Sequence, residues 1–214
     1  MTMLPKRLTP ADRTAVAQHF AALDEPDLRL RFGYLPMADA VHGYVQGLDF
    51  GRDALYGVFD PDLRLLAVSH LAVGHDPSVA EFGVSVLKTH RCQGLGLTLL
   101  ERSLEHAANS GVHTFDIQTL AQNRPMLKLM LRHTADIEAD GTERIAHLHL
   151  AAGGVVSHLH ELALDEMAAA EFLTARRLRD ARQLWRGIRH YRRSGALPQA
   201  PTATDDAPLQ QAGS

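Results

Sequence analysis

Apolar residues recur along the chain with two different periods, which predict strands and helices in turn. Runs of β-branched and aromatic residues bounded by turn residues such as Asp60-Pro61-Asp62 predict strands. Between Leu97 and Ala107 the apolar residues follow helical spacing, which predicts a helix over residues 94–110. The expected strands are Ala54–Phe59, Arg64–Val73, Val79–Val86, Thr114–Thr119 and Arg144–Leu150, and a second helix is expected over Asn123–His133. Strands interleaved with helices predict an α/β sandwich with a mixed, largely antiparallel sheet flanked by helices.

The N-terminal part predicts a short strand and then broken helices. Met3–Leu8 is the expected strand, and Thr9-Pro10-Ala11-Asp12 has the cap-then-proline pattern of a helix start. Residues 24–46 predict helical segments that Pro26 and Pro36 interrupt.

The C-terminal third departs from this pattern after the glycine pair Gly153-Gly154. We therefore expect a main domain over 1–152, a helical extension over 153–193 and a disordered tail over 194–214, which is rich in Pro, Ala, Gln and Thr. The extension reads as one long helix or two, with the apolar stripe Leu162, Leu173, Leu178, Trp185 and Ile188.

Eight arginines and one aspartate lie between Arg176 and Arg193. They fit either a basic arm for nucleic acid or a membrane surface, or a helix docked through Trp185 on this or a partner subunit with its arginines in water. We favour the docked helix, which is compatible with a homodimer, because neither interleaved aromatics nor a folded binding motif supports nucleic-acid binding. The sequence leaves the oligomeric state open.

Composition narrows the class and the compartment. A chain of 214 residues can bury a real core, and a net charge of −3 gives no global attraction to nucleic acid or membrane. Cys92 is the single cysteine, so no internal disulfide can form. The first residues show no apolar signal region, and no run is long enough to span a membrane. We expect a cytoplasmic protein with no membrane segment.

The turn from Arg91 to Gly96 lies between an expected strand and an expected helix. Backbone N–H groups of such a turn, and those of the helix that it opens, point at one place and can hold a phosphate. No lysine follows the glycines, as the P-loop of nucleotide hydrolases requires, and Leu99 stands where the dinucleotide fingerprint needs glycine. The remaining pattern has Arg91, Gly94 and Gly96 at the positions of a pyrophosphate loop, although a simple strand-to-helix turn is the alternative.

Several segments in the same order resemble the GNAT family (GCN5-related N-acetyltransferases). The segment Leu65–Leu71 is similar to the strand before the family's acidic strand, and Ala80–Val86 is similar to the acidic strand itself. Arg91–Gly96 matches the acyl-CoA pyrophosphate loop, and Asn123–Leu127 resembles the start of the next helix. Further upstream, Arg29–Phe32 resembles a segment of the branch that includes protein-lysine acetyltransferase domains. The resemblance implies a GNAT-like sheet and acetyl-CoA as the acyl-donor substrate.

The resemblance also implies which residues contact the cofactor. A bulge on the acidic strand leaves main-chain N–H groups free for the pantetheine arm, and Gly83 is consistent with either a bulge or a close backbone approach. Asn123 is an expected cofactor contact, with capping of its helix as the alternative. The full expected set is Val84, Val86, Arg91, Cys92, Gln93, Gly94, Leu95, Gly96 and Asn123.

Acetyl transfer to an amine requires a base, because an amine of the lysine type has a pKa near ~10.4. Glu81 lies between Ala80 and Phe82, where we expect desolvation to raise its pKa towards neutrality. The family resemblance points to the same strand for the base. The alternative for Glu81 is an edge carboxylate paired with an arginine.

The leaving group marks a departure from the family pattern. Many members carry a Tyr seven residues after the helix-opening Asn, and here that position is Met130, which cannot donate a proton. Solvent, or a neighbour such as His133, could protonate the thiolate instead. Otherwise the protein binds acyl-CoA without turning it over.

Two functions therefore stay open. The first is an N-acetyltransferase that moves the acetyl group to a protein lysine or a small amine by direct attack in a ternary complex. The second is a catalytically weak, acyl-CoA-binding regulatory protein. The sequence does not decide whether Tyr34, Tyr44 and Tyr56 line an acceptor pocket or the core, and we expect no metal site although the chain has 13 histidines.

Overall fold

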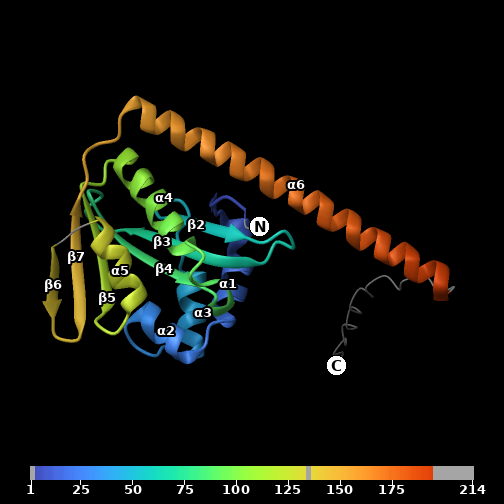
Figure 1. Cartoon of the computed structure of the whole chain (residues 1–214), viewed down its shortest axis with the longest axis horizontal. Coiled ribbons are helices and arrows are strands. Elements are labelled where there is room, and N and C mark those ends of the chain that lie inside the picture. The colour runs from blue at the N-terminus through green and yellow to red at the C-terminus, as the bar shows by residue number, and fades with distance from the viewer. Residues whose placement is uncertain (1–2, 134–135, 195–214) are drawn as a thin grey trace, which may run out of the picture. The chain divides into compact units, whose positions relative to one another are not determined.

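The computed structural model describes residues 3–133 and 136–194. Two compact units divide the chain, Met1–Arg176 and Arg177–Ser214. The first unit contains the sheet and the helices that cover it (Figure 1). Its strands are β1 (Lys6–Arg7), β2 (Ala54–Phe59), β3 (Leu65–Val73), β4 (Val79–Val86), β5 (Thr114–Leu120), β6 (Ile137–Asp140) and β7 (Glu143–His149). The helices are α1 (Arg13–Ala21), α2 (Glu25–Phe32), α3 (Ala38–Gln46), α4 (Leu95–Asn109), α5 (Arg124–His133) and α6 (Val155–Ser194), with short 3-10 helices η1 (Pro10–Asp12) and η2 (Lys88–His90).

The sheet has the strand order β1-β2-β3-β4-β5-β7-β6, and the described pairs are antiparallel except β4 with β5. The prediction of a mixed, largely antiparallel sheet flanked by helices is confirmed. The first strand is shorter than expected, and β6, which the sequence pattern did not predict, forms a hairpin with β7 through Gly141.

The sheet splits between β4 and β5. The two strands pair only from Val79 opposite Thr114 to Glu81 opposite Asp116. Beyond Glu81 the edge of β4 that faces β5 has no ladder partner there, while its other edge stays paired with β3 as far as Val86. The split therefore leaves backbone groups of β4 available to a ligand.

Side chains of β4 alternate between the two faces of the sheet. The ring of Phe82 stacks on Phe115 of β5 at 5.4 Å between centroids. On the opposite face, Ser85 meets His19 of α1 and Gly83 lies under Arg31 of α2. Helices α1 and α2 therefore cover one face, whereas α4 packs against β2, β3 and β4 from the other (Figure 1).

The first turns of α6 belong to the unit that holds the sheet. Arg102 of α4, only 4% exposed, donates to the Glu161 carbonyl at 3.2 Å and to Asp165 at 2.7 Å. His106 and Asn109 of α4 also bond the Glu161 carboxylate. The expected break at Gly153-Gly154 precedes the start of α6, and the compact unit continues to Arg176.

The apolar stripe expected on this helix is exposed in the described chain. Trp185 is 64% exposed, and Leu162, Leu173 and Leu178 are each more than half exposed. Ile188 and the tail expected over 194–214 lie outside the residues whose side chains are described. The helices described in the structure include none that is long and apolar enough to cross a membrane.

Candidate active site

The glycine turn has the backbone conformation that the sequence required. Gly94 caps α4 with φ at 83°, and Cys92 also has a positive φ of 59°. Only a residue without a Cβ adopts the left-handed region at little cost, which explains the glycine at 94. The positive φ values at Cys92 and Gly94 turn the chain from β4 into α4. The first N–H groups of α4 have no partner within the helix.

A cavity of about 410 Å³ opens beside this turn, along the unpaired part of β4. The turn, the second half of β4, the start of α5 and helix α2 form its walls. It brings together eight of the nine expected cofactor residues: Val84, Val86, Arg91, Cys92, Gly94, Leu95, Gly96 and Asn123. Residues from three separate stretches of sequence therefore meet around one hollow.

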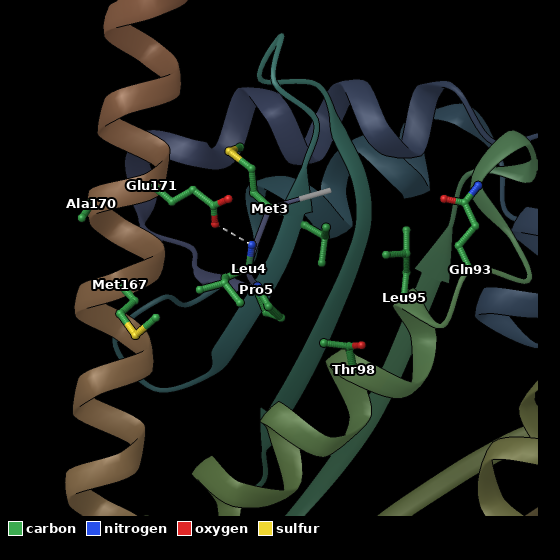
Figure 2. A pocket seen from close by; sticks show the side chains of 10 residues that line it. Met3, Leu4, Pro5, Gln93, Leu95, Thr98, Met167, Ala170 and Glu171 are labelled. Carbon is green, nitrogen blue, oxygen red and sulfur yellow. Dashed lines mark hydrogen bonds between the residues drawn. The ribbon is translucent and has the colours of Figure 1, made fainter. Parts of the chain in front are cut away.

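Gln93 is the ninth residue of the expected set, and it lines a different cavity. That second hollow, of about 640 Å³, lies between the N-terminal segment, α4 and α6, with Met3, Leu4, Thr98 and Met167 among its walls. Figure 2 shows Gln93 at one side of it and Glu171, which accepts a hydrogen bond from the Leu4 N–H at 2.8 Å, at the other. Among the residues of the pyrophosphate turn, Gln93 is thus the one whose side chain is directed elsewhere.

Arg91 has an acidic partner inside the first cavity. Its Nη2 lies 2.5 Å from Oδ1 of Asp27, a buried residue of α2. Its Nε donates to the Val86 carbonyl at 3.3 Å. These contacts hold the guanidinium at the cavity wall.

Asn123 both caps α5 and lines the cavity. Its Oδ1 accepts from the Met126 N–H at 3.3 Å, and its Nδ2 donates to Thr119 at 2.9 Å. The two alternatives considered for Asn123 are therefore compatible, since capping leaves one side of the residue facing the hollow.

Glu81 does not have the environment that the sequence suggested. The side chain is exposed and does not line the cavity, so the expectation of desolvation is wrong. Glu81 is the last residue of β4 that pairs with β5. No ion pair with an arginine is recorded for it within the described residues.

Gly83 makes a close backbone approach and not a bulge. The β3–β4 ladder runs in one register through Gly83 opposite His70, so the expected bulge is wrong. A Cβ at Gly83 would stand 2.5 Å from Cζ of Arg31. The Arg31 guanidinium occupies the space that a Cβ at position 83 would need, so a larger residue there would have to displace the arginine.

Met130 is fully buried in the core, at 0% exposure, and is not part of the cavity wall. His133, considered as its substitute, is exposed and also lies outside the cavity. The position that carries a tyrosine in many family members is thus a packing position here.

Five residues of the cavity wall were not expected from the sequence. Asp27, Leu30, Arg31, Lys128 and Arg132 line it. The sequence offered little indication of the residues in α2, because this helix comes to lie beside β4 only in the tertiary fold. The resemblance over Arg29–Phe32 was the one hint in that direction.

Comparisons with known proteins agree with this geometry. Residues 36–134 match the family model described as the Acetyltransferase (GNAT) family. The GNAT domain of S. lividans PAT aligns with a TM-score of 0.58 at 17% identity, over 68% of this chain and 89% of that chain. YncA, a putative acetyltransferase from Salmonella typhimurium with its cofactor acetyl-CoA, aligns with a TM-score of 0.56 at 15% identity, over 72% and 96%. RimL, a ribosomal alpha-N-protein acetyltransferase in complex with coenzyme A, gives 0.56 at 16%, over 70% and 94%. The comparison with curated proteins gives no significant match.

The fold is that of solved GNAT N-acetyltransferases, and residues 36–134 of the chain are similar to the GNAT family model.

Proposed function

We propose that this protein transfers the acetyl group of acetyl-CoA to a primary amine, on a protein lysine or a small molecule, by direct attack in a ternary complex. The observation that carries the proposal is the cavity at the split between β4 and β5, which joins the pyrophosphate turn to the unpaired edge of β4. The turn amides would hold the diphosphate, and the β4 backbone would bind the pantetheine arm and polarise the thioester.

The charges around the cavity support an anionic ligand. Among the described residues that line it are the cations Arg31, Arg91, Lys128 and Arg132 and one carboxylate, that of Asp27. Isothermal titration with acetyl-CoA tests the binding step, and we expect one saturable site. A wild-type protein that gives neither heat nor a thermal shift with millimolar acetyl-CoA would end the proposal.

We propose that Glu81 acts as the base through a water molecule, because its side chain is exposed and lies outside the cavity. Glu81 and Gly83 are two residues apart on β4 and therefore lie on the same face of the strand. This places the carboxylate near the position proposed for the thioester. Replacing Glu81 with Gln should lower turnover and leave the affinity for acetyl-CoA unchanged. Unchanged turnover would remove Glu81 from the mechanism.

A protein lysine is the acceptor class that we test first. The segment Arg29–Phe32, which resembles the protein-lysine branch, lies in α2 beside the cavity. Mass spectrometry of proteins incubated with acetyl-CoA and the enzyme would detect new acetyl-lysine, and a panel of free amines would detect the small-molecule alternative.

The regulatory alternative has its own supporting observation, since Met130 is buried and Glu81 lies outside the cavity. It predicts acetyl-CoA binding without amine-dependent release of CoA thiol. A thiol assay with both amine classes separates the two functions.

Two further properties are proposed from single observations. The free, exposed Cys92 suits a reducing compartment such as the cytoplasm. The exposed apolar side chains of α6 suit a homodimer, which light scattering of the purified chain would detect.

A further inference from the structure

Helix α6 carries most of the exposed apolar surface of the described chain. Nine of the 14 large apolar side chains that are exposed there lie on this helix: Val155, Val156, Leu159, Leu162, Met167, Leu173, Leu178, Leu184 and Trp185. Apolar side chains that gather on one exposed element mark an interaction surface, whereas scattered ones need no explanation. The helix therefore offers a surface to a partner.

The side of α6 that packs on its own domain is a different one. Its side chains follow a helical spacing of four and three residues: Glu161, Asp165, Ala168 and Phe172. Ala168 is 2% exposed, and the ring of Phe172 lies 4.9 Å from that of Phe59. By contrast, Leu162 and Leu173 are each more than half exposed. The core of the domain therefore does not cover the apolar side of the helix.

The exposed positions of α6 repeat every 11 residues. Three series of exposed residues have this spacing: Val155, Glu166 and Arg177; Leu159, Ala170 and Ala181; Leu162, Leu173 and Leu184. Eleven residues make about three turns of an α-helix, so each series stays on one side of the helix. We call these nine residues the outer stripe.

Two residues of the outer stripe are charged, Glu166 and Arg177. Neither has an ion pair with another described residue. A charge within an apolar helix interface is unfavourable unless an opposite charge meets it, and it therefore sets the register and the direction of the pairing. The partner of this helix must bring a cation to Glu166 and an anion to Arg177.

The two ends of α6 carry opposite charge. Residues 155–175 include four carboxylates and no Lys or Arg, whereas residues 176–193 include eight Arg and one Asp. A second α6 that runs in the opposite direction brings acid to base at both ends. One that runs in the same direction places Glu166 beside Glu166 and Arg177 beside Arg177, where like charges repel.

We propose that α6 pairs with the α6 helix of a second copy of this chain, antiparallel and centred between residues 171 and 172. In that register Glu166 of each copy faces Arg177 of the other, and Leu159 faces Leu184. The same surface serves both copies, as a twofold axis requires. This inference gives a geometry to the homodimer proposed above, and it does not depend on acetyl transfer.

A basic arm for nucleic acid or for an anionic membrane is the competing explanation. It accounts for the arginines after residue 176. It does not account for Glu166 within the stripe, nor for the exposed Leu159 and Leu162 in the acidic part of the helix. Antiparallel pairing uses the apolar positions and both charges.

Charge reversal tests the pairing. Sedimentation velocity gives the dissociation constant of the dimer for the wild type, Glu166→Arg, Arg177→Glu and the double variant that carries both changes. Each single reversal creates two like-charge contacts in a symmetric antiparallel dimer, so the dissociation constant should rise about tenfold or more. The double variant restores both pairs and should return to within about threefold of the wild type.

Arg182→Glu is the matched control. It makes the same change of charge on the same helix, but Arg182 lies five residues after Arg177, about 140° around the helix and outside the stripe. The dissociation constant should stay within about threefold of the wild type. The side chains of Glu166, Arg177 and Arg182 are all exposed in the single chain, so each variant should keep a cooperative melting transition.

A wild type that stays monomeric up to its limit of solubility would overturn the inference. A dimer that the single reversals leave unchanged, or that the double variant fails to restore, would overturn it too. Binding of duplex RNA or phosphatidylserine vesicles by a monomeric wild type would assign the arginines to the competing explanation. These measurements use no acetyl-CoA, so their failure is distinct from a failure of the proposed acetyl transfer.

Discussion

The Arg91 guanidinium lies 2.5 Å from the carboxylate of Asp27, so the arginine of the pyrophosphate turn already has an anionic partner inside the cavity. Asp27 is 8% exposed, whereas the Arg91 side chain is 38% exposed. A diphosphate that binds at the turn must therefore compete with this carboxylate for Arg91, and it meets a like charge at the same wall.

The competition predicts opposite effects for the two partners. Asp27→Asn should tighten acetyl-CoA binding up to about tenfold, and Arg91→Ala should weaken it by about tenfold or more, since a charge-assisted hydrogen bond contributes ~1.5–3 kcal/mol. Isothermal titration measures both. Lys88→Ala is the matched control, because Lys88 pairs with Asp24 in the same way but in solvent. If Asp27→Asn instead weakens acetyl-CoA binding, Asp27 does not compete with the ligand but holds Arg91 in position for it.

The two glycines of the turn should respond differently to alanine. At Gly94, with φ of 83°, alanine should cost ~1–2 kcal/mol of stability. At Gly96 a Cβ would meet Leu129 at 3.4 Å, and the better helix propensity of alanine offsets that contact, so stability should change by less than ~1 kcal/mol. Denaturant titration measures stability, and we expect both variants to weaken acetyl-CoA binding. Equal losses of stability would contradict the account of Gly94.

Restoring the tyrosine at position 130 should not restore a catalytic acid. Met130 is at 0% exposure in the core, so Met130→Tyr would bury a hydroxyl and overfill a packed site at a cost of ~2 kcal/mol or more. The melting temperature should fall and turnover should not rise. An increase in kcat at full stability would show that this position reaches the thioester after all.

The contact between α4 and α6 should make stability depend on acid pH. Burial alone would raise the pKa of Glu161, but hydrogen bonds from His106 and Asn109 and the charges of His106 and Arg102 outweigh burial and lower that pKa from 4.5 to about 2. A lowered pKa adds stability that is fully present above pH 4.5 and is lost as the pH falls towards 2. Because solvent screens part of this interaction, the effect is on the order of 2 kcal/mol, less than the direct conversion of the pKa change would give.

Denaturant titrations of the wild type and of Glu161→Gln test this dependence. The variant should be less stable at pH 7, and the gap should narrow as the pH falls from 4.5 to 2. Asp180→Asn is the control, since Asp180 lies on the same helix in water. If the difference in stability between the wild type and Glu161→Gln stays constant with pH, the ionisation of Glu161 is not its cause.

Local sequence patterns predicted well the strands of the sheet and the helices that cover it, because each of these patterns involves only neighbouring residues. The strand Ala54–Phe59 and the helix Leu95–Asn109 lie where the apolar spacing put them. The short strand Ile137–Asp140 escaped notice, since a strand at the sheet edge with three exposed residues has little apolar signal.

The turn over residues 91–96 could be predicted from the sequence because its pattern lies in six consecutive residues, and Gly94 has the positive φ that such a turn requires. The environment of Glu81 could not, since apolar neighbours in sequence do not report whether a helix covers the strand. The hydrogen bonds that join Arg31, Tyr44, His70 and Asp53 were equally hidden, because these residues are distant in sequence and meet only after α2 and α3 pack on the sheet.

Arg102 carries a practical consequence for anyone who shortens this protein. Its guanidinium is 4% exposed, and two of its three acidic neighbours, Glu161 and Asp165, come from α6. A fragment ending at residue 152 would keep the cation and lose both of those anions, whereas one ending after Arg176 would retain them. The shorter fragment should therefore aggregate or melt early, for a reason that has nothing to do with coenzyme A.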